Sequence, residues 1–423
     1  MYQDPESPVI TRHFVNFRER QVHFRLAGSG PPLLLLHQSP ASSAEMATEL
    51  EIFADDFTVI APDTPGFGLS DPLPDERSDG APDLTPYAEA LGEFLSALGI
   101  ETTLIYGFHT GAMLGFEFAR LYPGRCAAAI VNGLVVCEPA ELADLLQNYN
   151  VMPSLTPEGT HLPWMWARMR DQLLFFPWYR KKRDARMHFD MADPGHINDH
   201  LIDFLRAKDG GRAGYQAAFA YPTKERIGDI QAPVYLLNYS QDPLAGHPER
   251  LAKIPDEMPR EVFAGPDKLH ERVLEILREH ATQPVQLQSA STGEFGREWA
   301  GKLHSEFVNT DVGPVFVRCS ASGSDPAVIW LHDAGSSSRS LEPVARRLTG
   351  SHQMILVDLP GHGETGVLHL QDYSAERLAR LVVDVMNGLD IENASVVANG
   401  SHAPSQWRCC DRTLMWRWSG ISC

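Results

Sequence analysis

A short glycine-flanked segment, Gly107-Phe108-His109-Thr110-Gly111, constrains the fold of this chain more than any other feature. An apolar run over 103–106 predicts a strand before it, and residues 112–119 predict a helix after it. In G-x-S-x-G turns the two glycines relieve the crowding of a sharp strand-to-helix bend, which lifts the middle side chain above the sheet. The middle residue is His109 in this chain, where that motif has serine. We therefore expect a sheet covered by helices, with an imidazole presented at the end of one strand.

Strand patterns alternate with helix patterns over the first 280 residues, with one long interruption. Alternation of this kind predicts a mostly parallel sheet with helices on both faces, which is an α/β fold. Between 138 and 225 the alternation stops, and this segment predicts an inserted helical cap. The alternation returns with predicted strands at 234–238 and 261–264 and a predicted helix over 269–280.

The opening of the chain recurs in its last third. HFVNF at 13–17 returns as EFVNT at 306–310, and later loop residues return in the same order. His332 follows His37 by 295 positions, and Asp358 follows Asp63 by the same interval. Landmarks that agree in order and spacing predict an internal duplication.

The repeat and the composition together predict four segments. A complete domain is expected over 1–285 with its cap at 138–225, then a linker over 286–303, and then a truncated second copy over 304–402. The register of the second copy places a glycine at the position of His109, so we assign no chemistry to it. Residues 403–423 are rich in cysteine and tryptophan and match nothing in the first copy, which suggests an aberrant tail produced by a frameshift.

Composition excludes several classes of function. A formal net charge of -19 argues against nucleic acid and against anionic membrane surfaces, because both require basic patches. The sequence shows neither a secretory leader pattern nor an apolar run of membrane-spanning length. The six cysteines lack framework or metal-ligand spacing, which predicts a reduced, cytoplasmic protein without a structural metal. No cofactor motif is present, since the Gly66-Phe67-Gly68 turn lacks the lysine and spacing of a phosphate-binding loop. The sequence gives no oligomeric state.

The order of landmarks over 11–280 resembles the α/β-hydrolase superfamily in its capped, single-sheet form. Four features carry the resemblance: the His37-Gln38-Ser39-Pro40 loop, Asp63 before Pro65-Gly66-Phe67-Gly68, the 107–111 turn, and Asp242 after a late strand. The resemblance implies that the backbone amides of Ser39 and Thr110 bind an oxyanion. It also implies that Asp242 is the acid of a catalytic triad, which orients and stabilises an imidazole.

Two departures from the family pattern concern the catalytic residues. The turn carries His109 in place of a nucleophile, and the segment after the last strand, where the family has its histidine, contains none. His270 is the nearest candidate for a catalytic base, although it falls inside the predicted final helix. Because an imidazole reaches further than a serine hydroxyl, we predict that His109 hydrogen-bonds Asp242 directly and forms a His–Asp dyad.

These residues predict a hydrolase that acts on an ester or another activated carbonyl compound, with His109 activating water. The alternatives are a lyase-type or cofactor-independent proton transfer, and a non-catalytic binding module with a degenerate triad. The run of aromatic residues and methionines over 162–179 lies in the predicted cap, above the expected pocket. It therefore favours an apolar or aromatic small-molecule substrate.

Overall fold

The computed structural model describes residues 8–17, 19–74, 83–287, 299, 301–311, 313–320, 327–367 and 373–398. The chain divides into two compact units: Met1–Thr11 with Val22–Gln288, and Arg12–Gln21 with Ser289–Cys423. The predicted tail over 403–423 and the predicted glycine counterpart of His109 lie outside the described residues. Among the residues that the structure describes, no helix combines the length and the apolar character needed to span a membrane.

The larger sheet has eight strands in the order β1-β2-β4-β3-β5-β6-β7-β8. From β4 to β8 every neighbouring pair is parallel, while β2 pairs with β4 in the antiparallel sense. The α/β-hydrolase fold predicted from the sequence is therefore present. The strands are β1 (Thr11–Phe17), β2 (Arg20–Ala27), β3 (Pro32–Leu36), β4 (Thr58–Pro62), β5 (Thr103–Phe108), β6 (Cys126–Asn132), β7 (Val234–Tyr239) and β8 (Arg260–Phe263).

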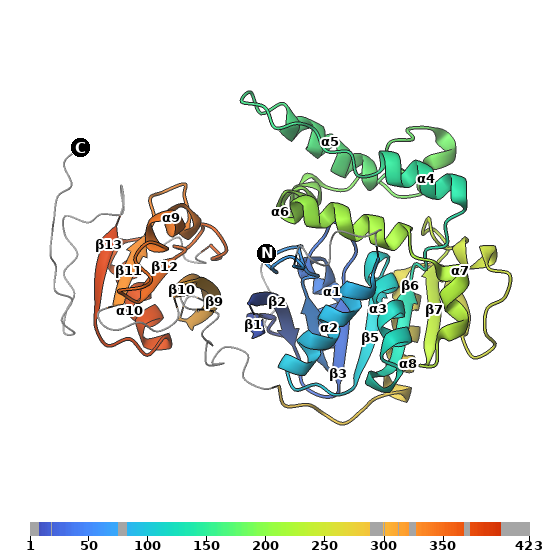
Figure 1. Ribbon diagram of the computed structural model, residues 1–423, viewed down its shortest axis with the longest axis horizontal. Helices are drawn as coiled ribbons and strands as arrows, with labels where there is room; N and C mark the ends of the chain where they lie inside the picture. Colours follow the sequence, from blue (N-terminus) through green and yellow to red (C-terminus); the bar gives the residue numbers. More distant parts are fainter. Residues whose placement is uncertain are drawn as a thin grey trace. The chain divides into compact units, whose positions relative to one another are not determined.

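Helices cover both faces of this sheet, and a further group of helices lies beyond one end of its strands (Figure 1). That group is inserted between β6 and β7, in the segment predicted to be a cap. The sheet-covering helices are α1 (Ala47–Phe53), which continues the 3-10 turn Ser43–Met46, then α2 (Thr85–Ala97), α3 (Thr110–Leu121) and α8 (Pro266–Glu279). The inserted helices are α4 (Pro139–Asn148), α5 (His161–Gln172), α6 (Pro194–Phe219) and α7 (Thr223–Arg226).

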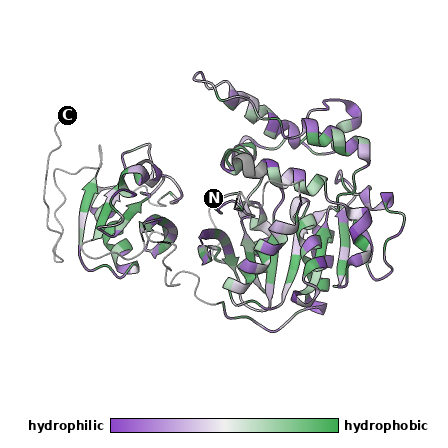
Figure 2. Cartoon of the chain, viewed as in Figure 1, coloured by the Kyte–Doolittle hydropathy of each residue, from purple (hydrophilic) through white to green (hydrophobic). Residues whose placement is uncertain are grey.

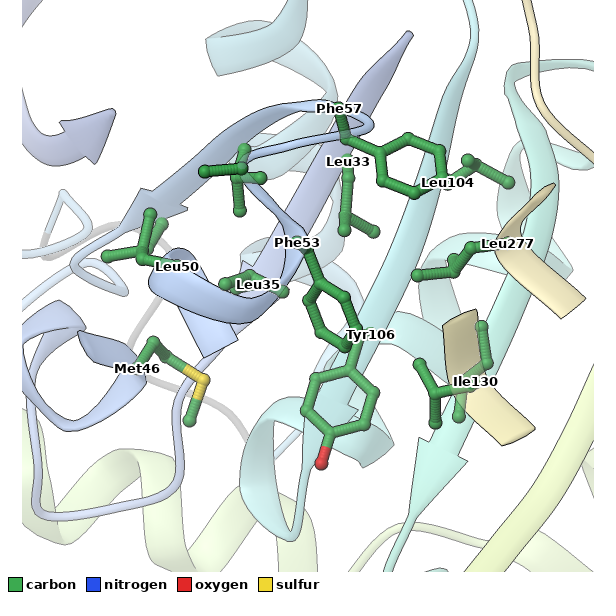
Figure 3. Close-up of a cluster of buried hydrophobic side chains, with 14 of the residues drawn as sticks. Leu33, Leu35, Met46, Leu50, Phe53, Phe57, Leu104, Tyr106, Ile130 and Leu277 are labelled. Atoms are coloured by element: carbon green, nitrogen blue, oxygen red, sulfur yellow. The ribbon is translucent and has the colours of Figure 1, made fainter. Parts of the chain in front are cut away.

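One core cluster of the first unit lies between the sheet and the pair α1 and α8 (Figure 3). Leu33 and Leu35 of β3 meet Phe53 of α1, while Leu277 comes from α8 and Tyr106 from β5. The central strands are apolar along their whole length, because helices bury both of their faces (Figure 2). This packing fixes the ends of β3, β5 and β7, where the candidate site lies.

The second unit contains a five-stranded sheet in the order β13-β11-β12-β10-β9. Read from β9, this is the strand order of the first five strands of the larger sheet, β1-β2-β4-β3-β5. The senses of pairing also agree, since β10 is antiparallel to β12 and β11 is parallel to both β12 and β13. Its elements are β9 (Leu303–Thr310), β10 (Gly313–Ser320), β11 (Ala327–Leu331), α9 (Glu342–Ala345), β12 (Met354–Val357), α10 (Ala375–Gly388) and β13 (Ala394–Ala398).

Candidate active site

His109 stands at the sharp turn between β5 and α3, with φ of 47° and ψ of -107°. Its backbone amide donates to the Asn132 carbonyl at 2.9 Å. The two flanking glycines allow the bend, because a Cβ on Gly107 would lie 2.7 Å from the Ala112 Cα. A Cβ on Gly111 would collide with the Leu36 carbonyl oxygen at the end of β3. The turn predicted from the sequence is therefore formed, and it holds His109 in a backbone conformation that costs free energy for a non-glycine residue.

Space for the imidazole is made at the end of β6. A Cβ on Gly133 would collide with Cδ2 of the His109 ring, and Gly133 itself adopts φ of +97°. Phe108 stacks on the same ring with centroids 4.0 Å apart. The His109 side chain keeps 21% of its surface exposed, and it lines a cavity of about 230 Å³. The ring is thus held on one side and open to the cavity on the other.

Asp242 lies just beyond β7 and is hydrogen-bonded to the imidazole of His109. The distance between His109 Nε2 and Asp242 Oδ2 is 2.7 Å, so the hydrogen bond predicted from the sequence is present. The Leu244 amide donates to the other carboxylate oxygen at 2.7 Å. Burial of Asp242 opposes its ionisation, but the charge of His109 and these hydrogen bonds outweigh it and hold the pKa of Asp242 below its ordinary value. Asp242 is therefore ionised at neutral pH and stabilises a positive charge on His109.

The second ring nitrogen of His109 faces Gln38, in the loop after β3. The distance from His109 Nδ1 to Gln38 Oε1 is 3.1 Å. Gln38 Nε2 donates in turn to Glu45 Oε1 at 2.6 Å, and the Gln38 amide donates to Glu45 Oε2 at 3.2 Å. Burial raises the pKa of Glu45 to about 7, although the hydrogen bonds from Gln38 act in the opposite direction. A hydrogen-bonded row therefore runs from Asp242 through His109 and Gln38 to Glu45.

The two predicted oxyanion donors, Ser39 and Thr110, both line the same cavity. Thr110 is the first residue of α3, so its amide has no acceptor within the helix. The partial positive charge of a helix N-terminus adds to the attraction for an anion there. Both residues lie next to members of the hydrogen-bonded row, Ser39 after Gln38 and Thr110 after His109.

His270, the other histidine considered as a base, is not brought to this cavity. It lies in the first half of α8, and its Nε2 is 3.2 Å from Glu49 Oε1 of α1. Its ring packs between Phe53 and Tyr106, with centroid distances of 6.2 Å and 6.4 Å. The prediction of His270 as a catalytic base is not supported, because α8 begins immediately after β8 and carries the ring to the helix–sheet core.

The aromatic part of the cavity wall comes from both the cap and the sheet, mostly from residues outside the 162–179 run. Most tryptophans and methionines of the 162–179 run pack within the cap, where Met165 and Met169 are buried against α6. From that run only Gln172, Leu173 and Phe176 line the cavity. The remaining aromatic wall consists of Phe108, Tyr149, Phe189, Tyr215, Phe219 and Tyr239.

Charged and metal-ligating groups near the cavity are few. Among the described residues that line it, none is an arginine or a lysine. His196 and His200 of α6 also line it, with ring centroids 4.4 Å apart. His200 Nε2 lies 4.0 Å from Glu45 Oε1. The wall is thus aromatic with a small polar corner around Glu45.

A group of side chains able to hold a metal ion lies elsewhere, on β9 and β10 of the second unit. The ligand atoms of His304, Glu306 and Cys319 all lie within 4.8 Å of one another. A nitrogen, an oxygen and a sulfur ligand suit zinc. Burial raises the pKa of Glu306 to about 7 and that of the Cys319 thiol well above its ordinary value. Sequence reasoning did not single out these residues, because their spacing of two along one strand and their pairing across the next strand match no metal-site pattern.

Sequence reasoning also missed the roles of Gln38, Glu45 and Gly133. Gln38 belongs to the loop that carries the family resemblance but was given no role, and Glu45 is a single acid outside any motif. Gly133 follows a strand, where glycine is common. No local pattern marks these three residues, since Gln38 and Gly133 contact His109 from other strands and Glu45 reaches it only through Gln38.

Comparison with known proteins agrees with this fold. Residues 31–154 match the model of the family described as alpha/beta hydrolase fold. The crystal structure of epoxide hydrolase A from Mycobacterium thermoresistibile superposes with a TM-score of 0.50 at 18% identity, covering 66% of this chain and all of that one. The first unit thus has the α/β-hydrolase fold, and residues 31–154 within it are similar to that family.

Two curated relatives share more sequence over a shorter span. A soluble epoxide hydrolase from Corynebacterium sp. (strain C12) is 30% identical over 169 residues, which are 40% of this chain and 51% of that protein. Haloalkane dehalogenase 2 from Mycobacterium tuberculosis is 34% identical over 179 residues, which are 38% of this chain and 60% of that protein. The match thus spans less than two thirds of either relative.

Proposed function

We propose that the first unit is a hydrolase of esters or other activated carbonyl compounds, in which the His109–Asp242 dyad activates water. The observation that carries this proposal is the 2.7 Å hydrogen bond between His109 Nε2 and Asp242 Oδ2, made beside an open cavity. Asp242 fixes the ring and favours its protonated form, as the acid of a triad does. The relatives named as an epoxide hydrolase and a dehalogenase support hydrolysis as the class of reaction.

The reaction proceeds by general-base catalysis, without a covalent intermediate on His109. Once the Gln38 side chain turns away from Nδ1, a water molecule hydrogen-bonded to that nitrogen attacks the carbonyl carbon and transfers one proton to the ring. The carbonyl oxygen becomes an oxyanion that accepts hydrogen bonds from the amides of Ser39 and Thr110. The bond to the leaving group then breaks, and the leaving oxygen takes the proton back from His109. The products are a carboxylic acid and an alcohol, and the ring returns to its starting state.

The cavity favours an uncharged aromatic or apolar substrate. Its wall is formed largely by aromatic side chains, and its described lining contains no arginine or lysine to pair with an anionic group. A cavity of about 230 Å³ accommodates a small ester rather than a polymer. Aryl esters are therefore the first substrates to test.

The test compares three proteins on a panel of small aryl esters: the full chain, His109→Ala and His270→Gln. General-base assistance typically contributes ~10²–10⁴-fold, so we expect His109→Ala to lose at least ~100-fold in kcat/KM. His270→Gln, a change at the other candidate histidine, is expected to keep the rate within about twofold, because that ring faces Glu49 in the helix–sheet core. Equal rates for the full chain and His109→Ala would exclude the dyad mechanism.

Isotope labelling separates hydrolysis from the lyase-type alternative. Turnover in H₂¹⁸O is expected to place one ¹⁸O atom in the carboxylic acid product. Product formed without ¹⁸O would select proton transfer by His109 instead. Ligand binding without turnover, unchanged in His109→Ala, would select a binding module.

We also propose that the second unit arose by duplication of the first part of the hydrolase domain. The shared strand order and the constant interval between matching histidines and aspartates support this origin. No reaction is assigned to this unit, because its register places a glycine at the position of His109.

A further inference from the structure

One face of β9 carries polar side chains where the fold buries apolar ones. Side chains alternate along a strand, so His304, Glu306 and Val308 share one face of β9. Val308 belongs to the apolar core of the second unit, and a Cβ on Gly388 of α10 would collide with it. His304 is 5% exposed, and the Glu306 side chain is 24% exposed. An imidazole and a carboxylate therefore lie largely buried beside this core.

Cys319 of β10 joins these two side chains from the neighbouring strand. In the antiparallel pairing of β9 and β10, His304 lies directly opposite Cys319. Directly opposite residues place their side chains on the same face of a sheet. The ligand atoms of His304, Glu306 and Cys319 come within 4.8 Å of one another, and His304 Nε2 lies 4.0 Å from Glu306 Oε2. A nitrogen, an oxygen and a sulfur atom from two strands thus converge on one point.

These three ligand types and their separation suit Zn²⁺. Bonds from zinc to its ligands measure about 2.0–2.3 Å, so neighbouring ligand atoms of a tetrahedral site lie about 3.3–3.6 Å apart. The three atoms of this group have to approach one another by no more than about 1.5 Å, a distance that side-chain rotation covers. Ca²⁺ and Mg²⁺ bind oxygen ligands, so an imidazole and a thiol favour zinc over either ion.

A small cavity beside His304 and Glu306 has room for a fourth ligand. Its volume is about 20 Å³, which is enough for one water molecule. Arg12 also lines this cavity, but its guanidinium pairs with Glu364 at 3.2 Å and stacks on the ring of Phe307. Because Phe307 and Glu306 alternate along β9, the guanidinium lies toward the face opposite to the ligand atoms.

The binding of a divalent cation changes the protonation of this group. Burial lowers the pKa of His304 to about 4, so the ring is neutral at pH 7, which is the form of imidazole that binds metals. Zinc stabilises the carboxylate of Glu306 and the thiolate of Cys319, so its binding releases the thiol proton and any proton on Glu306 to solvent. Zn²⁺ with one carboxylate and one thiolate has no net charge, which lowers the cost of burying it.

We propose that His304, Glu306 and Cys319 bind one Zn²⁺ ion, with a water molecule as the fourth ligand. The ion holds β9 and β10 together and so stabilises the second unit. This site is independent of the reaction proposed for the first unit. It goes against the prediction of a protein without a structural metal, which was made from the spacing of the cysteines.

The first unit forms the same strand pairing without these ligands. Leu26 takes the place of Cys319, 293 positions earlier, because β2 pairs with β4 as β10 pairs with β12. Thr11 takes the place of His304 at the same interval, and its hydroxyl donates to the Leu26 carbonyl at 3.3 Å. Strand pairing thus does not account for the polar group of the second unit, and metal binding does.

Cobalt substitution tests the site in the full chain. Co²⁺ occupies tetrahedral zinc sites, and a thiolate bound to it gives a charge-transfer band in the near ultraviolet. The reduced full chain, stripped of metal with a chelator, is titrated with Co²⁺ and then with Zn²⁺. We expect the band to saturate at one Co²⁺ per chain and to disappear when one equivalent of Zn²⁺ is added.

Thiol variants assign the band to Cys319. Cys319→Ser should lose the band, whereas Cys137→Ser, which removes a thiol of the first unit, should keep it. The double change Cys409→Ser with Cys410→Ser, near the end of the chain, should also keep it. An undiminished band in Cys319→Ser, or the loss of the band in either control, would overturn the proposal.

Hydrogen exchange decides the question even if Cys319→Ser fails to fold. One equivalent of Zn²⁺ should slow exchange of the amides of β9 and β10 in the full chain, because a ligand that binds the folded state stabilises it. Glu306→Gln keeps the shape of a partly exposed side chain, and should remain folded but lose this protection by zinc. Glu392→Gln, a change at an exposed acid of the same unit, should keep it. Zinc that slows exchange equally in Glu306→Gln, or in neither strand of the full chain, would refute the site.

Discussion

The two units brace the loop after their third strand in the same way, and in the first unit the hydrogen-bonded pair His109–Asp242 lies near this loop. In the first unit His37 Nε2 accepts from the Thr64 amide at 3.0 Å, and Nδ1 donates to the Gln38 carbonyl at 2.8 Å. In the second unit His332 makes the equivalent bonds to Leu359 and Asp333 at the same two distances. These histidines are neutral structural links, because each ring uses one donor and one acceptor. The comparison shows that the hydrogen bonds which support the loop do not depend on the side chains proposed to react.

A buried aspartate completes the brace in each unit. Asp63 accepts from the amides of Ser43 and Leu69 at 2.7 Å and 2.8 Å. Asp358 accepts from the amides of Ser338 and Glu364 at 2.6 Å and 2.9 Å. The units differ beside this carboxylate, since the first unit places His23 there and the second has Phe316 at the matching position of its strand. The two units therefore share the hydrogen bonds of this brace and differ in the side chains placed around it.

Asp242 lies in the first unit and is central to the proposed reaction. Its replacement should therefore lower activity more than any other substitution. Asp242→Asn keeps the size of the side chain but loses the charge that stabilises protonated His109. We expect kcat/KM on the best aryl ester to fall by at least ~100-fold, in line with general-base contributions of ~10²–10⁴. Urea unfolding should show that the variant remains folded. An unchanged rate would mean that the difference between the units does not reside in this dyad.

His23→Phe gives the first unit the residue that the second unit uses. His23 Nδ1 lies 2.9 Å from Asp63 Oδ2, and both side chains are 2% exposed. Removing one partner of a buried pair typically costs ~3–5 kcal/mol, so we expect a loss of about that size in the free energy of unfolding. Urea unfolding, with hydrogen exchange to assign the transition to the first unit, measures it. A neutral result would show that the amides alone are sufficient to hold Asp63.

Gly68 and Gly363 occupy the same place in the two braces, with φ of +51° and +53°. A Cβ at either position would collide with the buried aspartate, Asp63 or Asp358. Gly68→Ala and Gly363→Ala should therefore each destabilise their unit by about 2–3 kcal/mol, from the positive φ and the overpacking together. Gly124→Ala is the matched control, because a Cβ there meets nothing within 4 Å. Unequal effects at Gly68 and Gly363 would show that the two braces are not equivalent.

Glu45→Gln should give the smallest of these effects, and only at higher pH. Burial raises the pKa of Glu45 from 4.5 to about 7, so the folded state keeps a proton that the unfolded state loses. Its contribution to stability is fully present below pH 4.5 and is lost as the pH rises to about 7. Relative to Glu45→Gln, the full chain should therefore lose about 2 kcal/mol of unfolding free energy between pH 5 and 8.5.

Urea titrations at several pH values check this difference. Ser340→Ala in the matching position of the second unit serves as the control, since that side chain does not ionise. A difference between the full chain and Glu45→Gln that does not change with pH would contradict the raised pKa.

The sequence predicted the α/β fold and the turn that carries His109. Strand and helix periods are local properties, and the glycines at 107 and 111 mark a bend that tolerates no side chain at either position. The sequence also predicted the bond between His109 and Asp242, because the family resemblance implies a triad acid at Asp242 and an imidazole reaches further than a serine hydroxyl. The first two inferences depend on residues close in sequence, and the third depends on the resemblance.

Only the tertiary structure decided which other side chains reach His109. Glu45 lies 64 positions before His109 and touches it only through Gln38, while Gly133 makes room for the ring from a neighbouring strand. His270 is the opposite case. The loop between β8 and α8 is short, so α8 places this candidate base in the helix–sheet core and not at the cavity. Packing selects such partners by distances of a few ångströms between elements, and no spacing of residues along the chain encodes those distances.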